Sequence, residues 1–260
     1  MSEHIIKVAE GFWNIRGSFK VARLIDIGTH ASLVRRGDGQ FLLLDSYTLK
    51  GDVAREVDEL TGGKENVAAV LNLHPFHTIH VRAIHERYPD AKHYGTARHR
   101  SRHPELTWQP EHTEDAALHD LFADDLEFSV PAGVDFISAN EHVHFSSVLV
   151  MHRSSKTIHV DDTIMYIQLP RVLNFLGLAE SMSFHPTLAK VLEKREGAAQ
   201  DFRQWARSLA DRWSDAENLC AAHTSALLGR KNSGESIRDR ILGCLDKVEG
   251  KLVAHERVHG

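Results

Sequence analysis

Histidine is unusually frequent in this sequence and could supply the ligands of a metal site. Nineteen of the 260 residues are histidine, and they are spread along the chain rather than gathered at one end. Imidazole is the commonest metal ligand among side chains, and it titrates near neutral pH. Most of these histidines are expected at the surface or in local hydrogen bonds. A metal site requires that a few of them lie close together in the folded chain.

The densest group of histidines is the segment HPFHTIH, which directly follows the apolar run VAAVLNL. His74, His77 and His80 recur there at every third residue. Helical residues three apart lie on one face, so His77 and His80 could direct both imidazoles to one point at the start of a helix. Imidazole nitrogen combined with carboxylate oxygen suits Zn, Fe or Mn.

Three other apolar runs also lead to a residue that could bind a metal. Asp162 follows the run IHV and a first aspartate, His223 follows LCAA, and either His142 or His144 follows FISANE. In open α/β sheets, ligand-binding residues collect beyond the carboxyl ends of strands. An aspartate after a strand is also a common helix cap, so Asp162 is a candidate only in combination with the histidines.

Hydrophobic periodicity predicts the elements that would position these residues. In the first half these are strands at residues 31–34 and 41–45, a helix at 51–60, a strand at 67–73, a helix at 81–88 and a short strand at 92–96. The Asp38-Gly39 pair between the first two strands supplies the positive φ that a hairpin turn requires. Gly62-Gly63 is typical of the end of a helix.

The second half predicts hairpins followed by helices. Strands are expected at residues 126–130, 134–138, 146–151 and 157–161, with helices beyond residue 168 and one short strand at 219–222. The polar stretch 99–120 predicts a long loop and a short helix that would overhang the site. This order predicts two sheets with helices on the outside, in a single domain that spans residues 1–260.

Composition excludes several classes of partner. The net charge of −5 and the absence of a basic run argue against nucleic acid, and no apolar run approaches the ~20 residues that span a bilayer. The first residues lack the pattern of a secretion signal, and Cys220 and Cys244 form no disulfide framework. We therefore expect a cytoplasmic protein that acts on a small molecule, and we leave a homodimer open.

Five segments, in this order, resemble the metallo-β-lactamase superfamily over most of residues 20–250. FLLLD-Ser46 is similar to the family's "LLID-T/S-G", HPFHTIH to "H-x-H-x-D-H", and NEHVHFSS to "PGHTPGS". The segment IHVDD is similar to "L-F-T-G-D" with Asp162 at its aspartate, and LCAAH is similar to "V-P-G-H-G" with His223 at its histidine. The resemblance implies an α/β fold, the four-layer αβ/βα sandwich of that superfamily, with a metal site at one edge of its two sheets.

The resemblance also implies a metal-dependent hydrolase whose substrate is an ester, thioester, lactone, amide or phosphoester. Zinc is the expected ion, with iron or manganese as alternatives. The implied metal ligands are His74, His77, His80, His142 or His144, Asp162 and His223. Asp162 is the candidate catalytic residue, because it could hold and orient the attacking water. His74 is either a ligand or a residue that orients one.

Two other functions fit the same residues. The first is a non-haem iron redox protein on the same fold, because histidine and aspartate also bind iron. The second is a relative that binds no metal and catalyses no reaction. Three features of HPFHTIH support this alternative. The segment has one residue more than the family motif, it has no aspartate, and Ile79 stands where the second metal's carboxylate ligand would be. The glycines of the family's later motifs are also absent, and the sequence looks most like a little-studied branch.

Overall fold

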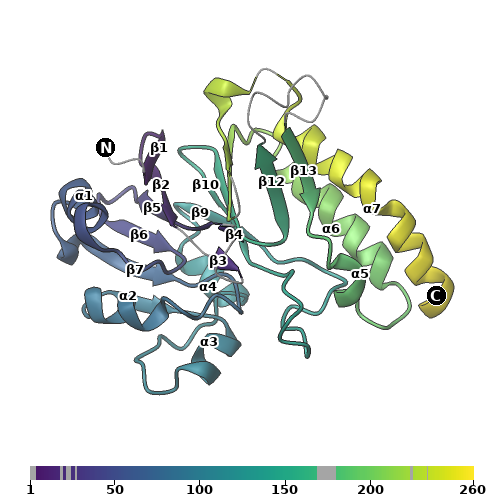
Figure 1. Cartoon of the computed structure of the whole chain (residues 1–260), viewed down its shortest axis with the longest axis horizontal. Helices are drawn as coiled ribbons and strands as arrows, with labels where there is room; N and C mark the ends of the chain where they lie inside the picture. Colours follow the sequence, from purple (N-terminus) through teal and green to yellow (C-terminus); the bar gives the residue numbers. More distant parts are fainter. Residues whose placement is uncertain are drawn as a thin grey trace.

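The structure is a computed structural model that describes residues 4–17, 20–21, 25–26, 28–168, 180–222, 225–232 and 234–260. Two β-sheets face each other in the middle of the molecule, and helices cover the outer side of each (Figure 1). In Figure 1 the half that contains α1 and α2 lies on the left, and the half that contains α6 and α7 lies on the right.

The first sheet has six strands in the order β1-β2-β5-β6-β7-β8. Their bounds are Ile5–Ala9, Phe12–Gly17, Thr29–Arg35, Phe41–Leu44, Val67–Leu71 and Lys92–Tyr94. β5 and β6 form the predicted antiparallel hairpin. β6, β7 and β8 are parallel, so α1 (Gly51–Thr61) and α2 (Val81–Arg87) make the crossover connections that parallel strands need.

The second sheet has five strands in the order β15-β14-β11-β10-β9. Their bounds are Ala226–Leu227, Asn218–Ala221, Thr157–Val160, Leu149–His152 and Leu126–Ser129. α6 (Ala198–Arg212) and α7 (Ile237–His259) pack against this half of the molecule. β11 and β14 are parallel neighbours in this sheet, although they lie far apart in the sequence.

Shorter elements complete the fold. These are β3 (Lys20–Val21), β4 (Ile25–Asp26), β12 (Ile164–Gln168), β13 (Glu180–Phe184), α3 (Ala97–Arg102), α4 (Ala116–Leu121), α5 (Leu188–Val191), and the 3-10 turns η1 (Lys64–Asn66) and η3 (Gly229–Lys231). β12 and β13 pair in an antiparallel hairpin, where the sequence predicted helix beyond residue 168. The strand predicted at 134–138 is reduced to one bridge between Val134 and Leu192.

Three hydrophobic clusters correspond to the three spaces between four layers. One joins the first sheet to α1 and α2 through residues such as Leu43 and Val57. A second lies between the sheets and includes Leu44 and Val150, and the third joins the second sheet to α6 and α7 through residues such as Leu209. Burial of these apolar side chains is the main force that holds the layers together.

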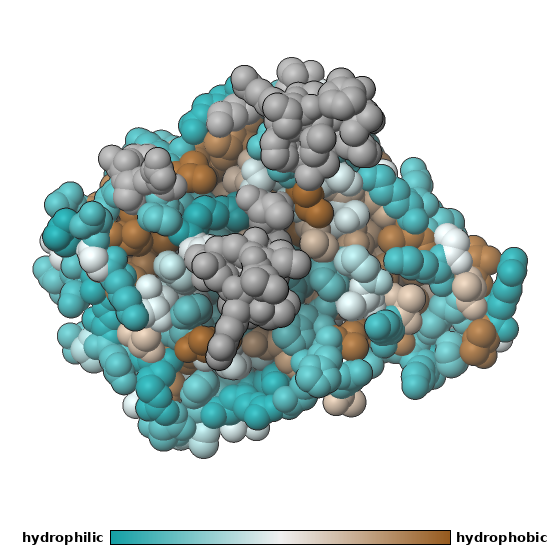
Figure 2. All heavy atoms as spheres, in the orientation of Figure 1, coloured by the Kyte–Doolittle hydropathy of each residue, from teal (hydrophilic) through white to brown (hydrophobic). Residues whose placement is uncertain are grey.

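The outer surface is mostly polar. In Figure 2 hydrophilic side chains predominate on the face that is shown, and apolar side chains appear in separate patches between them. Among the described residues, no helix has both the length and the apolar character that crossing a membrane requires.

Candidate metal centre

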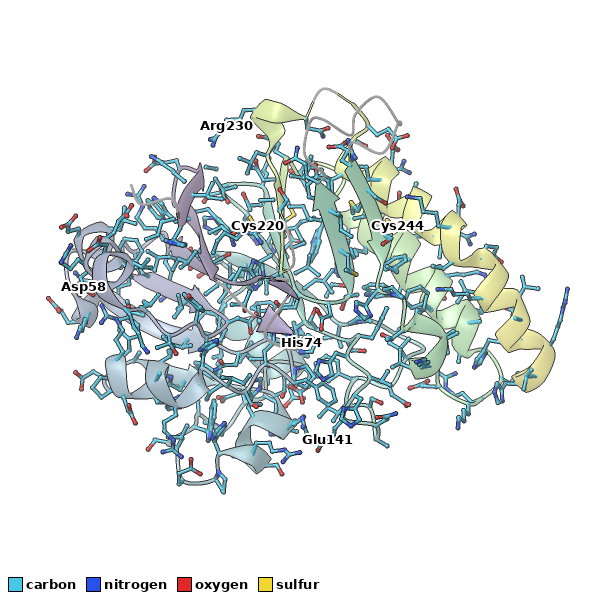
Figure 3. The ribbon with its side chains drawn as sticks, viewed as in Figure 1. Asp58, His74, Glu141, Cys220, Arg230 and Cys244 are labelled. Carbon is cyan, nitrogen blue, oxygen red and sulfur yellow. The ribbon has the colours of Figure 1, made fainter. Side chains whose placement is uncertain are left out.

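Strands from both sheets end beside one another and supply the polar side chains of the centre. β6 is followed directly by Asp45, β7 leads shortly into His74, and β11 leads into Asp161 and Asp162. In Figure 3, His74 lies near the middle of the molecule, between its two halves. These strand ends explain how residues more than a hundred positions apart become neighbours.

Asp45 holds the segment that carries the first histidine. Its Oδ1 accepts a hydrogen bond from the backbone N–H of Leu73 at 2.7 Å. The carbonyl oxygen of Leu73 accepts a second bond from the N–H of Val148, which belongs to the other half of the molecule. Asp45 adopts a positive φ of 59° at the end of its strand. The backbone that leads into His74 is therefore fixed from both sides.

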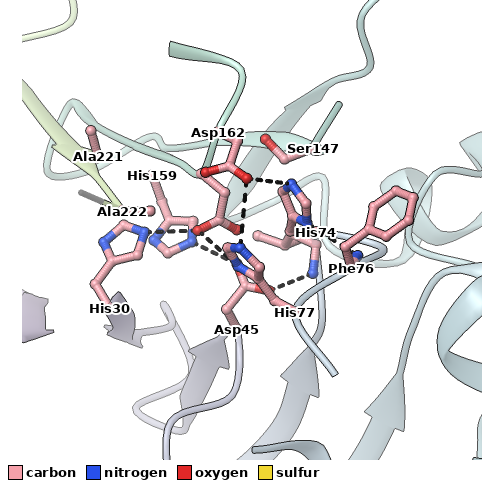
Figure 4. Close-up of polar contacts among 12 residues, drawn as sticks. His30, Asp45, His74, Phe76, His77, Ser147, His159, Asp162, Ala221 and Ala222 are labelled. Carbon is pink, nitrogen blue, oxygen red and sulfur yellow. Dashed lines mark hydrogen bonds and ion pairs between the residues drawn. The ribbon is translucent and has the colours of Figure 1, made fainter. Parts of the chain in front are cut away.

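The first group of possible metal ligands is His74, His77 and Asp162, each offering one atom within 4.8 Å of the others. His74 Nε2 lies 3.1 Å and His77 Nε2 lies 3.8 Å from Asp162 Oδ2. Figure 4 shows the rings and carboxylates converging. The His77 side chain is 26% exposed, whereas those of His74 and Asp162 are 0% and 4% exposed. Solvent can therefore reach this group from the side of His77.

These residues fit a metal ion in donor type and in spacing. Zinc ligands lie about 2.0–2.2 Å from the ion, so tetrahedral neighbours are about 3.3 Å apart. His74 Nε2 is buried and has no hydrogen-bond partner among the described residues. His74 Nδ1 accepts the N–H of Phe76 at 3.1 Å, which leaves the proton of the neutral ring on Nε2. An ion bound to Nε2 would require that proton to move to Nδ1, so the N–H of Phe76 would lose its acceptor and the contact would have to open.

A second group lies deeper between the sheets and consists of His30, His159 and Asp161. His30 Nε2 lies 3.3 Å from Asp161 Oδ1, and the rings of His30 and His159 stack at 4.3 Å. His159 Nε2 also lies 2.9 Å from Asp45 Oδ2. His77 connects the two groups, because its Nδ1 is 3.6 Å from Asp161 Oδ1.

Burial and neighbouring charges set the protonation of the centre. Burial lowers the pKa of His74 and lowers that of His30 to about 3, so both rings are neutral at physiological pH. Burial also opposes protonation of His77, but the nearby carboxylates, first of all Asp161, outweigh it and raise the pKa of His77 to about 9.

The two inner carboxyl groups are affected in opposite directions. Burial, reinforced by the negative charge of Asp161, raises the pKa of Asp45 to about 7. Burial would also raise the pKa of Asp161, but His77 and His30 outweigh it and hold the pKa of Asp161 well below its ordinary value. The centre thus combines acidic, neutral and protonated groups in one buried cluster.

The remaining predicted ligands lie apart from the first group or outside the described residues. His80 is the residue before α2, and its Nδ1 makes a 2.8 Å hydrogen bond with Thr48 Oγ1. His142 is exposed, and His144 Nε2 donates to the carbonyl oxygen of Glu141, with its ring 5.9 Å from that of His74. His223 lies outside the described residues. The metal-binding roles of these four histidines stay predictions.

Ile79 stands where the family motif has an aspartate. Its side chain is 71% exposed. The place of the family's second carboxylate ligand is therefore taken by an apolar side chain at the surface, and not by another polar group.

Sequence reasoning did not single out His30, Asp45, His159 or Asp161 as members of the centre. His30 and His159 each lie inside an otherwise apolar strand, a position that is usually a core site. One usable signal was present: residues two apart in a strand point to the same side, so His159 and Asp161 share a direction. The partnership of His30 with them depends on the packing of the two sheets, which the sequence does not display.

The comparisons with known proteins concern the fold. The metallo-β-lactamase from Erythrobacter litoralis, with β-mercaptoethanol in its active site, is similar over 96% of this chain and 98% of that chain, at 16% identity and a TM-score of 0.62. The metallo-β-lactamase from Hirschia baltica is similar over 94% of this chain and 96% of that chain, at 14% identity and a TM-score of 0.58.

A third solved structure is the metallo-β-lactamase FIM-1 from Pseudomonas aeruginosa in its mono-zinc form. It matches 94% of this chain and 95% of that chain, at 13% identity and a TM-score of 0.57. No model of a protein family and no curated protein matches the sequence. The chain has the metallo-β-lactamase fold, as its five sequence landmarks predicted, and it carries two groups of residues that could hold a metal ion.

Proposed function

We propose that this protein is a metal-dependent hydrolase in which His74, His77 and Asp162 bind a zinc ion. The observation that carries the proposal is the convergence of one donor atom from each residue within 4.8 Å. Two imidazoles and one carboxylate suit zinc, and iron or manganese as alternatives. A zinc enzyme with the same fold, FIM-1 in its mono-zinc form, supports the choice of ion.

A bound divalent ion would lower the pKa of water from about 15.7 to roughly 7 and would polarise a carbonyl or phosphoryl oxygen. The chain's own residues define how a substrate approaches. Because His77 is the exposed member of the group, the substrate would enter beside it. Ile79, two residues after His77, is 71% exposed and would be the nearest exposed large apolar side chain along the sequence, whereas the Phe76 ring packs against His144 and Arg98. We infer a substrate with an ester, thioester, lactone, amide or phosphoester bond.

His74 supports Asp162 in this proposal. Its ring is fully buried, lies 3.1 Å from Asp162 Oδ2 and stacks on His77 with ring centres 4.0 Å apart. It thereby limits the rotation of both neighbours. Asp162 is proposed as the catalytic residue that orients the attacking water, in addition to holding the ion.

The test combines metal content with activity. Protein purified without added metal is analysed for transition metals and assayed with a panel of esters, thioesters, lactones, amides and phosphoesters. We expect at least one substrate class to be hydrolysed. His77→Ala and Asp162→Asn should reduce that rate at least about 100-fold, because ligand loss removes the ion or its activation of water.

His112→Ala is the matched control. The His112 side chain is 32% exposed, similar to that of His77, and pairs with Asp115 outside both groups. This variant should keep its metal and its activity. His80→Ala and His142→Ala determine whether those two histidines are ligands. Wild-type protein with only traces of transition metal and no hydrolytic activity would contradict the proposal and favour a relative without catalytic function.

A further inference from the structure

The deeper group contains buried polar atoms that lack hydrogen-bond partners. Both carboxylate oxygens of Asp161 and the Nε2 atom of His30 are buried and make no hydrogen bond to the described residues. Asp161 is 2% exposed and His30 is 2% exposed. A buried carboxylate without hydrogen bonds is costly unless a cation lies beside it. The protonated His77 ring, whose Nδ1 is 3.6 Å from Asp161 Oδ1, supplies one such charge, and a metal ion would supply a stronger one. The His30 and Asp161 atoms point toward one another, with His30 Nε2 3.3 Å from Asp161 Oδ1.

The outer contacts of the two rings bear on which of their nitrogens carries the proton. His159 Nδ1 lies 2.9 Å from Ser32 Oγ, which can accept its N–H, and His159 Nε2 lies 2.9 Å from Asp45 Oδ2. An ion bound to His159 Nε2 would therefore replace the hydrogen bond to Asp45. His30 Nδ1 lies 3.0 Å from the side-chain amide of Asn14. An outer partner that accepts the N–H of one ring nitrogen is the usual way in which a protein prepares the other nitrogen for a metal.

The Asn14 amide would have to turn for His30 to bind an ion through Nε2. Asn14 Oδ1 is buried without a hydrogen-bond partner among the described residues, while Nδ2 donates to the Ala31 carbonyl at 3.3 Å and faces His30 Nδ1 and Ser32 Oγ. This orientation leaves the proton of the neutral His30 ring on Nε2. With the amide turned by 180°, Oδ1 would accept from His30 Nδ1, and the bond to Ala31 would be lost.

The spacing of the inner atoms also fits an ion. The separations of His30 Nε2 from Asp161 Oδ1 and of His159 Nε2 from Asp45 Oδ2 are 3.3 and 2.9 Å. Adjacent ligands around an ion at about 2.0–2.2 Å lie roughly 3 Å apart. Carboxyl groups and imidazoles from both sheets therefore surround one small volume.

From this geometry we propose that His30, His159 and Asp161 bind a second divalent transition-metal ion, with Asp45 beside it. The site differs from the first group in position and in ligands: it lies between the sheets, and its members are 0–2% exposed. A substrate cannot reach it, so the second ion has a structural role. It connects β5 of the first sheet with β11 of the second and compensates the buried carboxylates. The proposal does not require an ion in the first group.

Zinc stoichiometry tests the proposal. The full chain is stripped with a chelator, dialysed against Zn²⁺ and analysed for bound metal. Wild type should bind two equivalents, and His30→Gln and His159→Gln should each lose one of them. His93→Gln is the matched control, because His93 is also buried and stacks on another histidine, His85, outside both groups. It should retain two equivalents.

The buried variants could fail to fold, so a variant at a more exposed position is also measured. His77→Ala removes a partly exposed ligand of the first group, and this variant should still bind one equivalent. An anomalous-scattering map of the zinc-loaded variant should show that ion beside His30, His159 and Asp161. If folded His30→Gln binds as much zinc as wild type, or if the map shows no ion there, the second site is overturned.

The outcomes separate this inference from the proposed function. Zinc that is lost in His30→Gln but kept in His77→Ala would support the deeper site and contradict the first ligand group. Zinc that is lost only in His77→Ala would do the reverse. The three His–Asp contacts of the centre would then be hydrogen-bonded pairs that only position His77.

Discussion

At the scale of residues, the centre is a set of histidine–aspartate pairs that share one buried space. Asp162 lies against His74, Asp161 against His30, and Asp45 against His159. Buried carboxylates are tolerated only with such partners or with a cation. The large number of histidines in the sequence is therefore explained in part by a need to accompany these carboxylates.

The protonation of His77 leads to a prediction on metal binding. Its pKa of about 9 means that the ring carries a proton at pH 7 in the metal-free protein. A metal ligand must be deprotonated, so binding of zinc to the first group should release about one proton at pH 7 and fewer as the pH rises through 9. Calorimetric titration in buffers of different ionisation enthalpy measures this number.

The same titration has an internal control. His77→Ala should release about one proton fewer per chain at pH 7 and should show a weaker dependence of zinc affinity on pH. Equal proton release by wild type and His77→Ala would mean that His77 is not a ligand.

The candidate site was only partly predictable at this scale. His74, His77 and Asp162 follow apolar strands, and that pattern is visible in the sequence. His80 shares their spacing, but the chain turns before α2 begins, and the ring bonds to Thr48. Helical spacing predicts a shared face only for residues within one helix, and His77 precedes the helix.

At the scale of elements, the ends of β7 and β11 determine the geometry of the centre. β7 is a strand of the first sheet and β11 of the second, and each leads to a candidate ligand a few residues beyond its end. Local sequence patterns predicted both strands, the hairpin of β5 and β6, and helices α1 and α2. These elements have strong local signals: continuous apolar runs in the strands, the Asp38-Gly39 pair at the hairpin turn, and the Gly62-Gly63 pair at the end of α1.

Two expectations for the second half were wrong, for physical reasons: β13 was not predicted, and the strand predicted at 134–138 does not form. β13 is short, and only its Met182 and Phe184 are buried, so its alternation is brief. Its pairing with β12 comes from tertiary contact. Residues 134–138 have the composition of a strand, but their backbone pairing is limited to the bridge between Val134 and Leu192, with the N–H of Asp135 bonded to the carbonyl of Val191. A short apolar segment becomes a strand only where a neighbour supplies hydrogen bonds.

The packing of α6 against the second sheet leads to a stability prediction. Leu209 is 1% exposed and belongs to the core of this half. Leu209→Ala should lower the free energy of unfolding by about 2–5 kcal/mol, because it removes buried apolar surface and leaves a cavity. Leu121→Ala, at a position that is 53% exposed, should change it by less than about 0.5 kcal/mol. Urea unfolding curves measure both, and similar losses would contradict the assignment of the core.

At the scale of the whole molecule, the candidate metal centre lies where the two halves of the sandwich meet. His74 and His77 follow a strand of the first sheet, and Asp162 follows a strand of the second. An ion held by both would bind the folded state and not the unfolded chain. Such binding stabilises the fold by mass action, by about 2.7 kcal/mol when the free ion exceeds its Kd 100-fold.

Removal of the ion should therefore lower the melting temperature. For a domain of this size the expected shift is roughly 5–10 °C. Thermal unfolding followed by circular dichroism, with and without a chelator, measures it, and His112→Ala should show the same shift as wild type. A chelator without effect on protein shown to contain metal would mean that the ion does not connect the two sheets.

Elemental analysis and anomalous scattering on crystals of untreated protein test the central claim most directly. We predict at least one equivalent of a transition metal and an anomalous peak within bonding distance of His74, His77 and Asp162. A metal content far below one equivalent, or a peak elsewhere with none beside these three residues, would contradict the account of this centre.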